Sequence, residues 1–227
     1  MTLNQIKSAI YALILTNNYG FKLRKVRGAT EVTRLRLEYA EVLLSKLNIS
    51  VEVEGVEKID HEGQYLILSN HRSIIDPLVI EIALKDKGVH SLWIAKKELF
   101  NSFFFGSFTR NAGSILLDRD AKQMSSFFKE IKARVGQGYS INVFPEGARN
   151  KSEATLSEFK KGSEVIAIKN RLRILPVFIK TSTSAVLMDA IKNNTKDLKV
   201  TIEIGDLIDY KDRSRTLQES YQHRFNI

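Results

Sequence analysis

A histidine and an aspartate, His71 and Asp76, lie five positions apart in the segment Ser-Asn-His-Arg-Ser-Ile-Ile-Asp-Pro. Imidazole is the side chain best suited to accept a proton near neutral pH. It becomes a better base when a carboxylate holds its far ring nitrogen and stabilises the imidazolium that forms. The spacing alone is weak evidence, because Asp76 before Pro77 also suits the start of a helix, and a loop histidine can simply bond to the backbone.

No nucleophilic side chain accompanies this pair. The chain contains no Cys, which excludes a cysteine nucleophile, a disulfide framework and a thiolate metal site. The segment closest to a G-x-S-x-G elbow, at 138–142, lacks the final glycine, and neither a Walker A nor an H-E-x-x-H motif is present. The sequence therefore favours a hydroxyl of the substrate as the nucleophile.

A second cluster of candidates lies in Phe-Pro-Glu-Gly-Ala-Arg, where Glu146, Gly147 and Arg149 share one loop. Arginine binds phosphate through two parallel hydrogen bonds, glutamate accepts hydrogen bonds from hydroxyls, and glycine lets the backbone approach a ligand closely. Upstream, the run Gly-Ser-Ile-Leu-Leu-Asp-Arg ends in Arg119. A polyol phosphate would satisfy this set, although surface ion pairs and an ordinary turn explain each residue taken singly.

Short apolar runs alternate with helical patterns along the rest of the chain. Alternation of this kind predicts an α/β domain with a mixed, mostly parallel sheet flanked by helices. In such a fold the chemistry lies beyond the carboxyl ends of the strands, where both candidate segments fall. Strands are expected at 50–56, 64–68, 91–94, 114–117, 140–144, 174–179 and 199–204, and helices at 77–87, 121–137 and 161–170.

The first fifth of the chain is basic and amphipathic. Apolar residues recur at helical spacing, and residues 1–46 hold 8 Lys or Arg against 3 Asp or Glu, in a chain whose net charge is +9. No apolar run reaches the roughly 18 residues that a membrane-spanning helix needs. We expect an N-terminal two-helix amphipathic appendage at 1–48 and an α/β domain at 49–227. The hairpin suits a surface-lying membrane anchor, or simply two helices packed on the core with solvated charges.

Taken in order, these segments resemble the motifs of the 1-acylglycerol-3-phosphate acyltransferases, the glycerolipid acyltransferase family. The resemblance covers about residues 50 to 205, and four ordered motifs carry it. Ala148 and Asn150 depart from the family pattern, which has Thr and Ser there. The matching segments are N-H-x4-D at 70–76, K-x-E-L at 96–99 with G-x-I-x-x-D-R at 113–119, F-P-E-G-A-R-N at 144–150, and an apolar run holding a proline at 174–179.

The resemblance implies transfer of a fatty acyl group from an acyl thioester, of acyl carrier protein or coenzyme A, to the sn-2 hydroxyl of 1-acylglycerol-3-phosphate, giving phosphatidic acid. His71 would be the general base and Asp76 would orient it, with no metal or redox cofactor. The acceptor phosphate would contact Arg119 and Arg149, with Lys96 as a weaker candidate. The glycerol part would contact Glu146 and Gly147.

The resemblance also bears on location and partners. Because acceptor and product live in a bilayer, we expect the protein to lie peripherally on the cytoplasmic face of an anionic membrane, without a nucleic-acid partner. Two alternatives remain open. The acceptor could be another lysolipid, such as a lyso-aminolipid or lysophosphatidylcholine. Outside this class, the chain could be a non-catalytic basic module that binds membrane or nucleic acid. The sequence leaves acyl-chain length, the choice of donor and the oligomeric state open.

Overall fold

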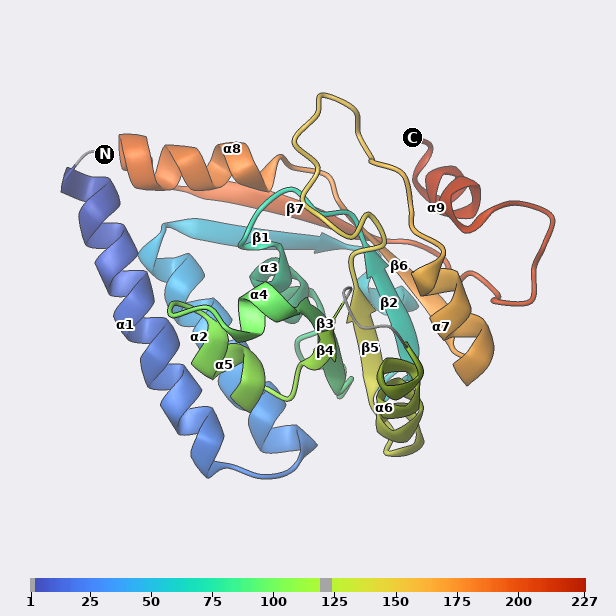
Figure 1. Ribbon diagram of the computed structural model, residues 1–227. Coiled ribbons are helices and arrows are strands. Elements are labelled where there is room, and N and C mark those ends of the chain that lie inside the picture. Colours follow the sequence, from blue (N-terminus) through green and yellow to red (C-terminus); the bar gives the residue numbers. More distant parts are fainter. Residues whose placement is uncertain (1–2, 119–123) are drawn as a thin grey trace.

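The computed structural model describes residues 3–118 and 124–227, and within these ranges the strands form one seven-stranded sheet in the order β1-β7-β6-β2-β5-β3-β4 (Figure 1). Neighbouring strands are parallel except for β6 and β7, which are antiparallel. The fold class is therefore confirmed, and each expected strand is present within two residues of its predicted bounds. The strands are β1 (Ile49–Glu54), β2 (Tyr65–Ser69), β3 (Ser91–Lys96), β4 (Ile115–Leu117), β5 (Ser140–Val143), β6 (Arg173–Ile179) and β7 (Leu198–Ile204).

Helices follow most of the strands. The expected helix at 77–87 is α3, which ends early because Asp86 and Gly88 adopt positive φ in the following turn. The expected helix at 121–137 begins on residues outside the described ranges. Four further helices, α4, α5, α8 and α9, were not expected. The helices are α1 (Leu3–Lys25), α2 (Ala29–Lys46), α3 (Asp76–Ala83), α4 (Lys97–Phe100), α5 (Gly106–Asn111), α6 (Ser125–Gly136), α7 (Gly162–Asn170), α8 (Thr183–Met188) and α9 (Leu217–Phe225).

Helices cover both faces of the sheet, giving three layers (Figure 1). On one face, apolar side chains of α1, α2, α3 and α8 pack against the sheet, and on the other those of α6, α7 and α9 do so. Strand β2 lies between β6 and β5, and each of its residues is buried. A strand covered on both faces needs the continuous apolar run that the sequence shows here.

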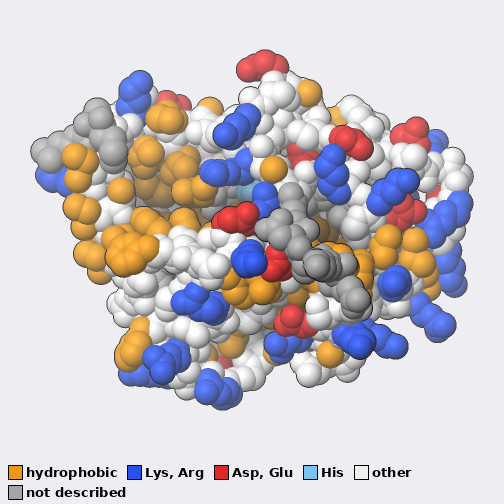
Figure 2. Space-filling view, viewed as in Figure 1, with side chains coloured by type: hydrophobic (Ala, Val, Ile, Leu, Met, Phe, Trp, Pro, Cys, Tyr) orange, Lys and Arg blue, Asp and Glu red, His pale blue; other side chains and the backbone are white. Residues whose placement is uncertain are grey.

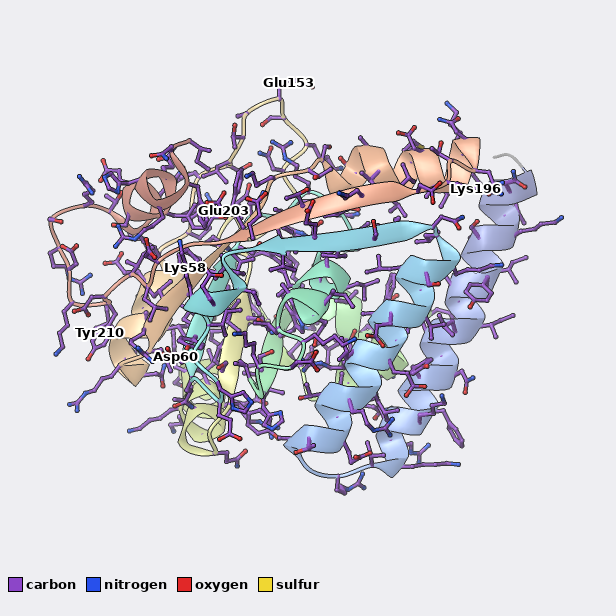
Figure 3. The ribbon with its side chains drawn as sticks, turned by 180° about the vertical axis from the view of Figure 1, so that it is seen from behind. Lys58, Asp60, Glu153, Lys196, Glu203 and Tyr210 are labelled. Atoms are coloured by element: carbon purple, nitrogen blue, oxygen red, sulfur yellow. The ribbon has the colours of Figure 1, made fainter. Side chains whose placement is uncertain are left out.

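The N-terminal hairpin packs against the rest of the fold. Tyr19 and Leu23 of α1, with Leu35 and Leu43 of α2, belong to the same apolar cluster as the sheet. Seen from behind, α1 and α2 lie side by side, and α2 is the one next to β1 (Figure 3). The two helices are thus part of one helical layer, and a domain boundary at residue 48 stays a prediction. No helix of the described residues has both the length and the apolar character required to cross a bilayer.

Candidate active site

The sheet topology brings the candidate segments to one edge. Strands β2, β5, β3 and β4 are neighbours and run parallel, so their carboxyl ends lie on the same side. His71 follows β2, Glu146 follows β5, and Lys96 ends β3. The loop after β4 leads into residues 119–123, and Arg119 therefore lies outside the described residues. Ligands of α/β sheets bind at such an edge.

His71 and Asp76 are in direct contact. The Nδ1 atom of His71 lies 2.7 Å from Oδ2 of Asp76, whose side chain is completely buried as the first residue of α3. The carboxylate does not cap the helix that it begins. It turns back instead, and Oδ2 accepts hydrogen bonds from the backbone amides of Arg72 at 2.6 Å and Ser73 at 2.7 Å. This contact holds a ring nitrogen of His71 as a base-orienting carboxylate would.

Thr183, which the sequence analysis missed, completes the environment of Asp76. Its hydroxyl, at the start of α8, donates a short hydrogen bond to Oδ1 of Asp76, 107 positions earlier in the chain. The carboxylate thus has partners on both oxygens, and its position is fixed from two sides. No local sequence pattern predicts this contact, because it depends on how the fold brings the start of α8, after β6, next to Asp76.

The imidazole of His71 is also fixed by an aromatic ring. Phe144, directly after β5, stacks on it with ring centroids 3.8 Å apart and an angle of 8° between the planes. The His71 side chain keeps 17% of its surface exposed, and its Nε2 makes no hydrogen bond within residues 3–118 and 124–227. With Nδ1 occupied by Asp76, Nε2 is the atom available to accept a proton from a substrate.

Glu146 joins the second candidate loop to the first. This buried side chain accepts a hydrogen bond from the backbone amide of His71 at 2.7 Å and another from Ser157 at 2.8 Å. The backbone amide of Asn150 in turn donates to the carbonyl of His71 at 2.7 Å. Gly147 turns the loop with φ of 69°, a region that favours glycine. Glu146 therefore positions the base, and its predicted contact with glycerol would use lone pairs that the two amides leave.

The candidate phosphate contacts are much less constrained. Arg149 is exposed, and it makes no hydrogen bond or ion pair with a described residue. Lys96 is half-buried at the end of β3 and likewise has no such partner in the described ranges. The next residue, Lys97, pairs with Asp118 at 2.8 Å and is thereby occupied. Arg149 and Lys96 are thus cations with free donors.

Arg72, another residue that the sequence analysis did not single out, fixes the outer loop of the site. Its guanidinium donates to the backbone carbonyls of Ser152, Ala154 and Thr155, at distances between 2.6 and 3.3 Å. The side chain of Asn150 bonds within the same loop, to Ala154 and Ser152, which accounts structurally for an amide where the family pattern has Ser. Glu153, at the tip, projects away from the sheet (Figure 3).

Known proteins match this chain over the segment that carries the site. The family model described as Acyltransferase matches residues 50–180. A 1-acyl-sn-glycerol-3-phosphate acyltransferase of Helicobacter pylori is 35% identical over 78% of this chain and 67% of its own length. One of Streptococcus pneumoniae is 26% identical over 80% of this chain and 64% of its own length. The chain thus spans about two thirds of these curated relatives.

The architecture also matches a solved structure. The crystal structure of the 1-acyl-sn-glycerophosphate acyltransferase of Thermotoga maritima superposes with a TM-score of 0.70 and 22% identity, covering 99% of this chain and 91% of that one. At that identity the likeness confirms the shared fold, including the two N-terminal helices. The family assignment rests on the sequence matches, whose segment contains both candidate loops. The chain belongs to the acyltransferase family.

Proposed function

We propose that this protein transfers a fatty acyl group from an acyl thioester to the free sn-2 hydroxyl of 1-acylglycerol-3-phosphate, forming phosphatidic acid. One observation carries the proposal: Nδ1 of His71 is held 2.7 Å from a buried carboxylate, while Nε2 is left available at the carboxyl edge of the sheet. The names of the Helicobacter pylori and Streptococcus pneumoniae relatives support the choice of acceptor.

The reaction follows from this geometry. Nε2 of His71 removes the proton of the acceptor hydroxyl as its oxygen attacks the carbonyl carbon of the thioester. The tetrahedral intermediate collapses, the C–S bond breaks, and the leaving thiolate takes the proton from the imidazolium. The products are an ester and a free thiol. Asp76 keeps the ring in one tautomer and stabilises its charged form, the role that a carboxylate has in a catalytic triad.

The remaining candidates recognise the acceptor. Arg149 and Arg119 bind its phosphate, and Lys96 adds a weaker contact from the end of β3. Gly147 lets the loop backbone approach the glycerol part, and Glu146 contributes mainly by holding His71 and Ser157. Guanidinium groups suit this task because they offer two parallel donors to a phosphate. The donor is a thioester of acyl carrier protein or coenzyme A, and the reaction as written needs neither a metal ion nor a redox cofactor.

We further propose that the protein works peripherally, on the cytoplasmic face of an anionic membrane, with the outer face of α1 in the bilayer surface. Ile6, Ile10 and Ile14 lie one helical turn apart on that face and are 41 to 64% exposed. Phe21 continues the row, and Phe103 is 86% exposed. Figure 2 shows apolar side chains gathered on the side where α1 lies. An apolar stripe with basic residues at its end is typical of surface-lying helices.

An acceptor panel tests the reaction. Purified protein is supplied with an acyl-coenzyme A or an acyl carrier protein thioester, and with lysophosphatidate, a lyso-aminolipid or lysophosphatidylcholine in detergent micelles. We expect thiol release and phosphatidic acid with lysophosphatidate. Faster turnover with another lysolipid would move the proposal to that acceptor. Absence of transfer to every acceptor, together with steeply salt-dependent binding to DNA, would instead favour a basic binding module.

Vesicle sedimentation tests the membrane proposal. Deleting the hairpin is a poor test, because α2 belongs to the apolar core. Replacing Ile10 and Ile14 by Ser alters only exposed positions, and we expect it to release the protein from phosphatidylglycerol vesicles. Ile168→Ser, at a position 37% exposed on α7, is the matched control and should leave sedimentation unchanged. Equal vesicle binding by all three proteins would contradict the proposed orientation.

A further inference from the structure

A buried ion pair joins the N-terminal hairpin to helix α3. A guanidinium nitrogen of Arg36, in α2, lies 2.7 Å from Oε1 of Glu81, in α3, and the two side chains are 3% and 7% exposed. Removing two charges from water costs several kcal/mol for each ion, roughly, and apolar residues of similar size often serve stability as well. Arg36 Nε and Asn142 Oδ1, both buried, also find no hydrogen-bond partner within the described ranges. Stability is therefore a poor explanation for the pair.

The pair has specific contacts with strand β3. The indole N–H of Trp93 donates to Oε1 of Glu81 at 2.8 Å. Arg36 donates to the backbone carbonyl of Ser91 and, at 3.3 Å, to its hydroxyl. Asn142, the residue opposite Trp93 on β5, donates to the same hydroxyl at 2.6 Å. The pair thus fixes the start of β3 through Ser91 and the orientation of the indole ring of Trp93.

From Trp93 the contacts continue to the base. Its ring lies against that of Phe144, with centroids 5.1 Å apart and planes 28° from parallel, and Phe144 in turn stacks on His71 at 3.8 Å. The hydrogen bond between Nδ1 of His71 and Asp76 fixes one atom of the imidazole and still permits some rocking of the ring plane. A ring packed flat on its face removes this freedom. Phe144 therefore sets the plane in which Nε2 meets the substrate.

We propose that Trp93, held by the buried Arg36–Glu81 pair, is a positioning residue that keeps Phe144 stacked on His71 and so aims Nε2 at the acceptor hydroxyl. This inference rests on the proposed role of His71 as general base. Misplacement of a reacting group by about 1 Å can cost on the order of 100-fold in rate, so a device that fixes the ring plane matters for turnover. Trp93 touches no reacting atom and acts through Phe144.

Trp93→Phe is the first test, because it removes the indole N–H but keeps an aromatic ring. We expect kcat to fall roughly 10-fold, with the acceptor KM unchanged, since the binding cations are untouched. Tyr39→Phe is the matched control. It deletes a buried hydroxyl bonded to Thr16 at 2.8 Å, in an aromatic cluster of the same layer, and should lower Tm without lowering kcat. Should Trp93→Phe fail to fold, Trp93→Tyr also removes the indole N–H.

A double-mutant cycle separates positioning from general loosening. Phe144→Leu removes the stacked ring, and we expect it to lower kcat at least as much as Trp93→Phe. If Trp93 acts through Phe144, adding Trp93→Phe to Phe144→Leu should change kcat by less than twofold. The effects of two substitutions are not additive when one residue acts through the other. A full additional 10-fold loss in that background, or a loss in Tyr39→Phe as large as in Trp93→Phe, would overturn the proposal.

A readout that needs no activity distinguishes this proposal from the proposed function. Because Phe144 stacks on His71, its ring current should shift the Hε1 proton of that imidazole, which can be followed by NMR at one fixed pH. In Trp93→Phe the resonance should move toward its position in Phe144→Leu. The resonance of His90, whose Nδ1 lies 3.1 Å from the hydroxyl oxygen of Thr33, should stay unmoved. An unmoved His71 resonance would overturn the positioning role. A moved resonance in a protein without acyl transfer would instead leave the positioning role standing and reject the proposed function.

Discussion

The two halves of the candidate site are built differently. On one side, Asp76 is completely buried, accepts hydrogen bonds at both oxygens and holds His71, which Phe144 covers. On the other side, Arg149 is exposed and has no partner among residues 3–118 and 124–227. A proton acceptor must be in place before the substrate arrives, because its misplacement slows the chemistry. A cation that clamps a phosphate can become ordered on binding, at an entropic cost that its new hydrogen bonds offset.

The largest expected effect is on the half of the site that contains His71. His71→Ala removes the proposed base, and a positioned general base contributes typically ~10²–10⁴-fold in rate. We expect kcat to fall by this factor in a steady-state assay with lysophosphatidate, while the circular dichroism spectrum shows that the fold is intact. Turnover like that of the wild type would remove His71 from the mechanism.

The exposed half of the site, with Arg149, should respond in substrate binding. Arg149→Ala deletes a proposed charge-assisted contact, which costs roughly 1.5–3 kcal/mol. We expect the acceptor KM to rise accordingly and kcat to change little, measured at saturating thioester. Arg215→Ala, at another exposed arginine, is the control and should leave the KM unchanged. The comparison between the halves breaks down if Arg149→Ala lowers kcat and leaves KM as it was.

A smaller effect is expected at Thr183, which contacts the carboxylate of Asp76 and not His71 itself. Thr183→Val keeps the shape of the side chain but removes the hydroxyl that donates to Asp76. We expect a loss of stability of about 1.5–3 kcal/mol in urea unfolding, together with a decrease in kcat well below that of His71→Ala. Thr183→Ser retains the hydroxyl and should restore kcat. An unaffected kcat in Thr183→Val would show that the remaining contacts of Asp76 suffice.

The smallest effect concerns Glu38, a half-buried carboxylate on α2. A hydrogen bond from the Tyr19 hydroxyl, 2.7 Å away, and then the charge of Lys22 hold the pKa of Glu38 below its ordinary value of 4.5. A lowered folded-state pKa contributes stability above the ordinary value, and that contribution is lost as the pH falls through the folded pKa. The difference in free energy of unfolding between wild type and Tyr19→Phe should therefore be larger at neutral pH than in acid. A difference independent of pH would contradict this linkage.

The sequence predicted what depends on local pattern. The apolar runs placed the strands, and the ordered motifs placed His71 and Glu146 at the correct edge. It could not predict Thr183 as a partner of Asp76, because that contact depends on how β6 and α8 return to the site. Helix α9 did carry an overlooked signal, the capping box formed by Thr216 and Glu219. The stacking of Phe144 on His71 could not be predicted, because a sequence pattern does not determine how two side chains are oriented.

The buried guanidinium of Arg36 also limits how the chain can be shortened. A version of the chain that begins at α2 keeps Arg36, but it loses Tyr19 and Leu23 of α1, which belong to the apolar cluster. A version that begins at β1 also loses Arg36, the partner of the Glu81 carboxylate, together with the α2 side chains of the same cluster. Useful versions should therefore keep both helices, and polar replacements on the outside of α1 are the safer route to solubility.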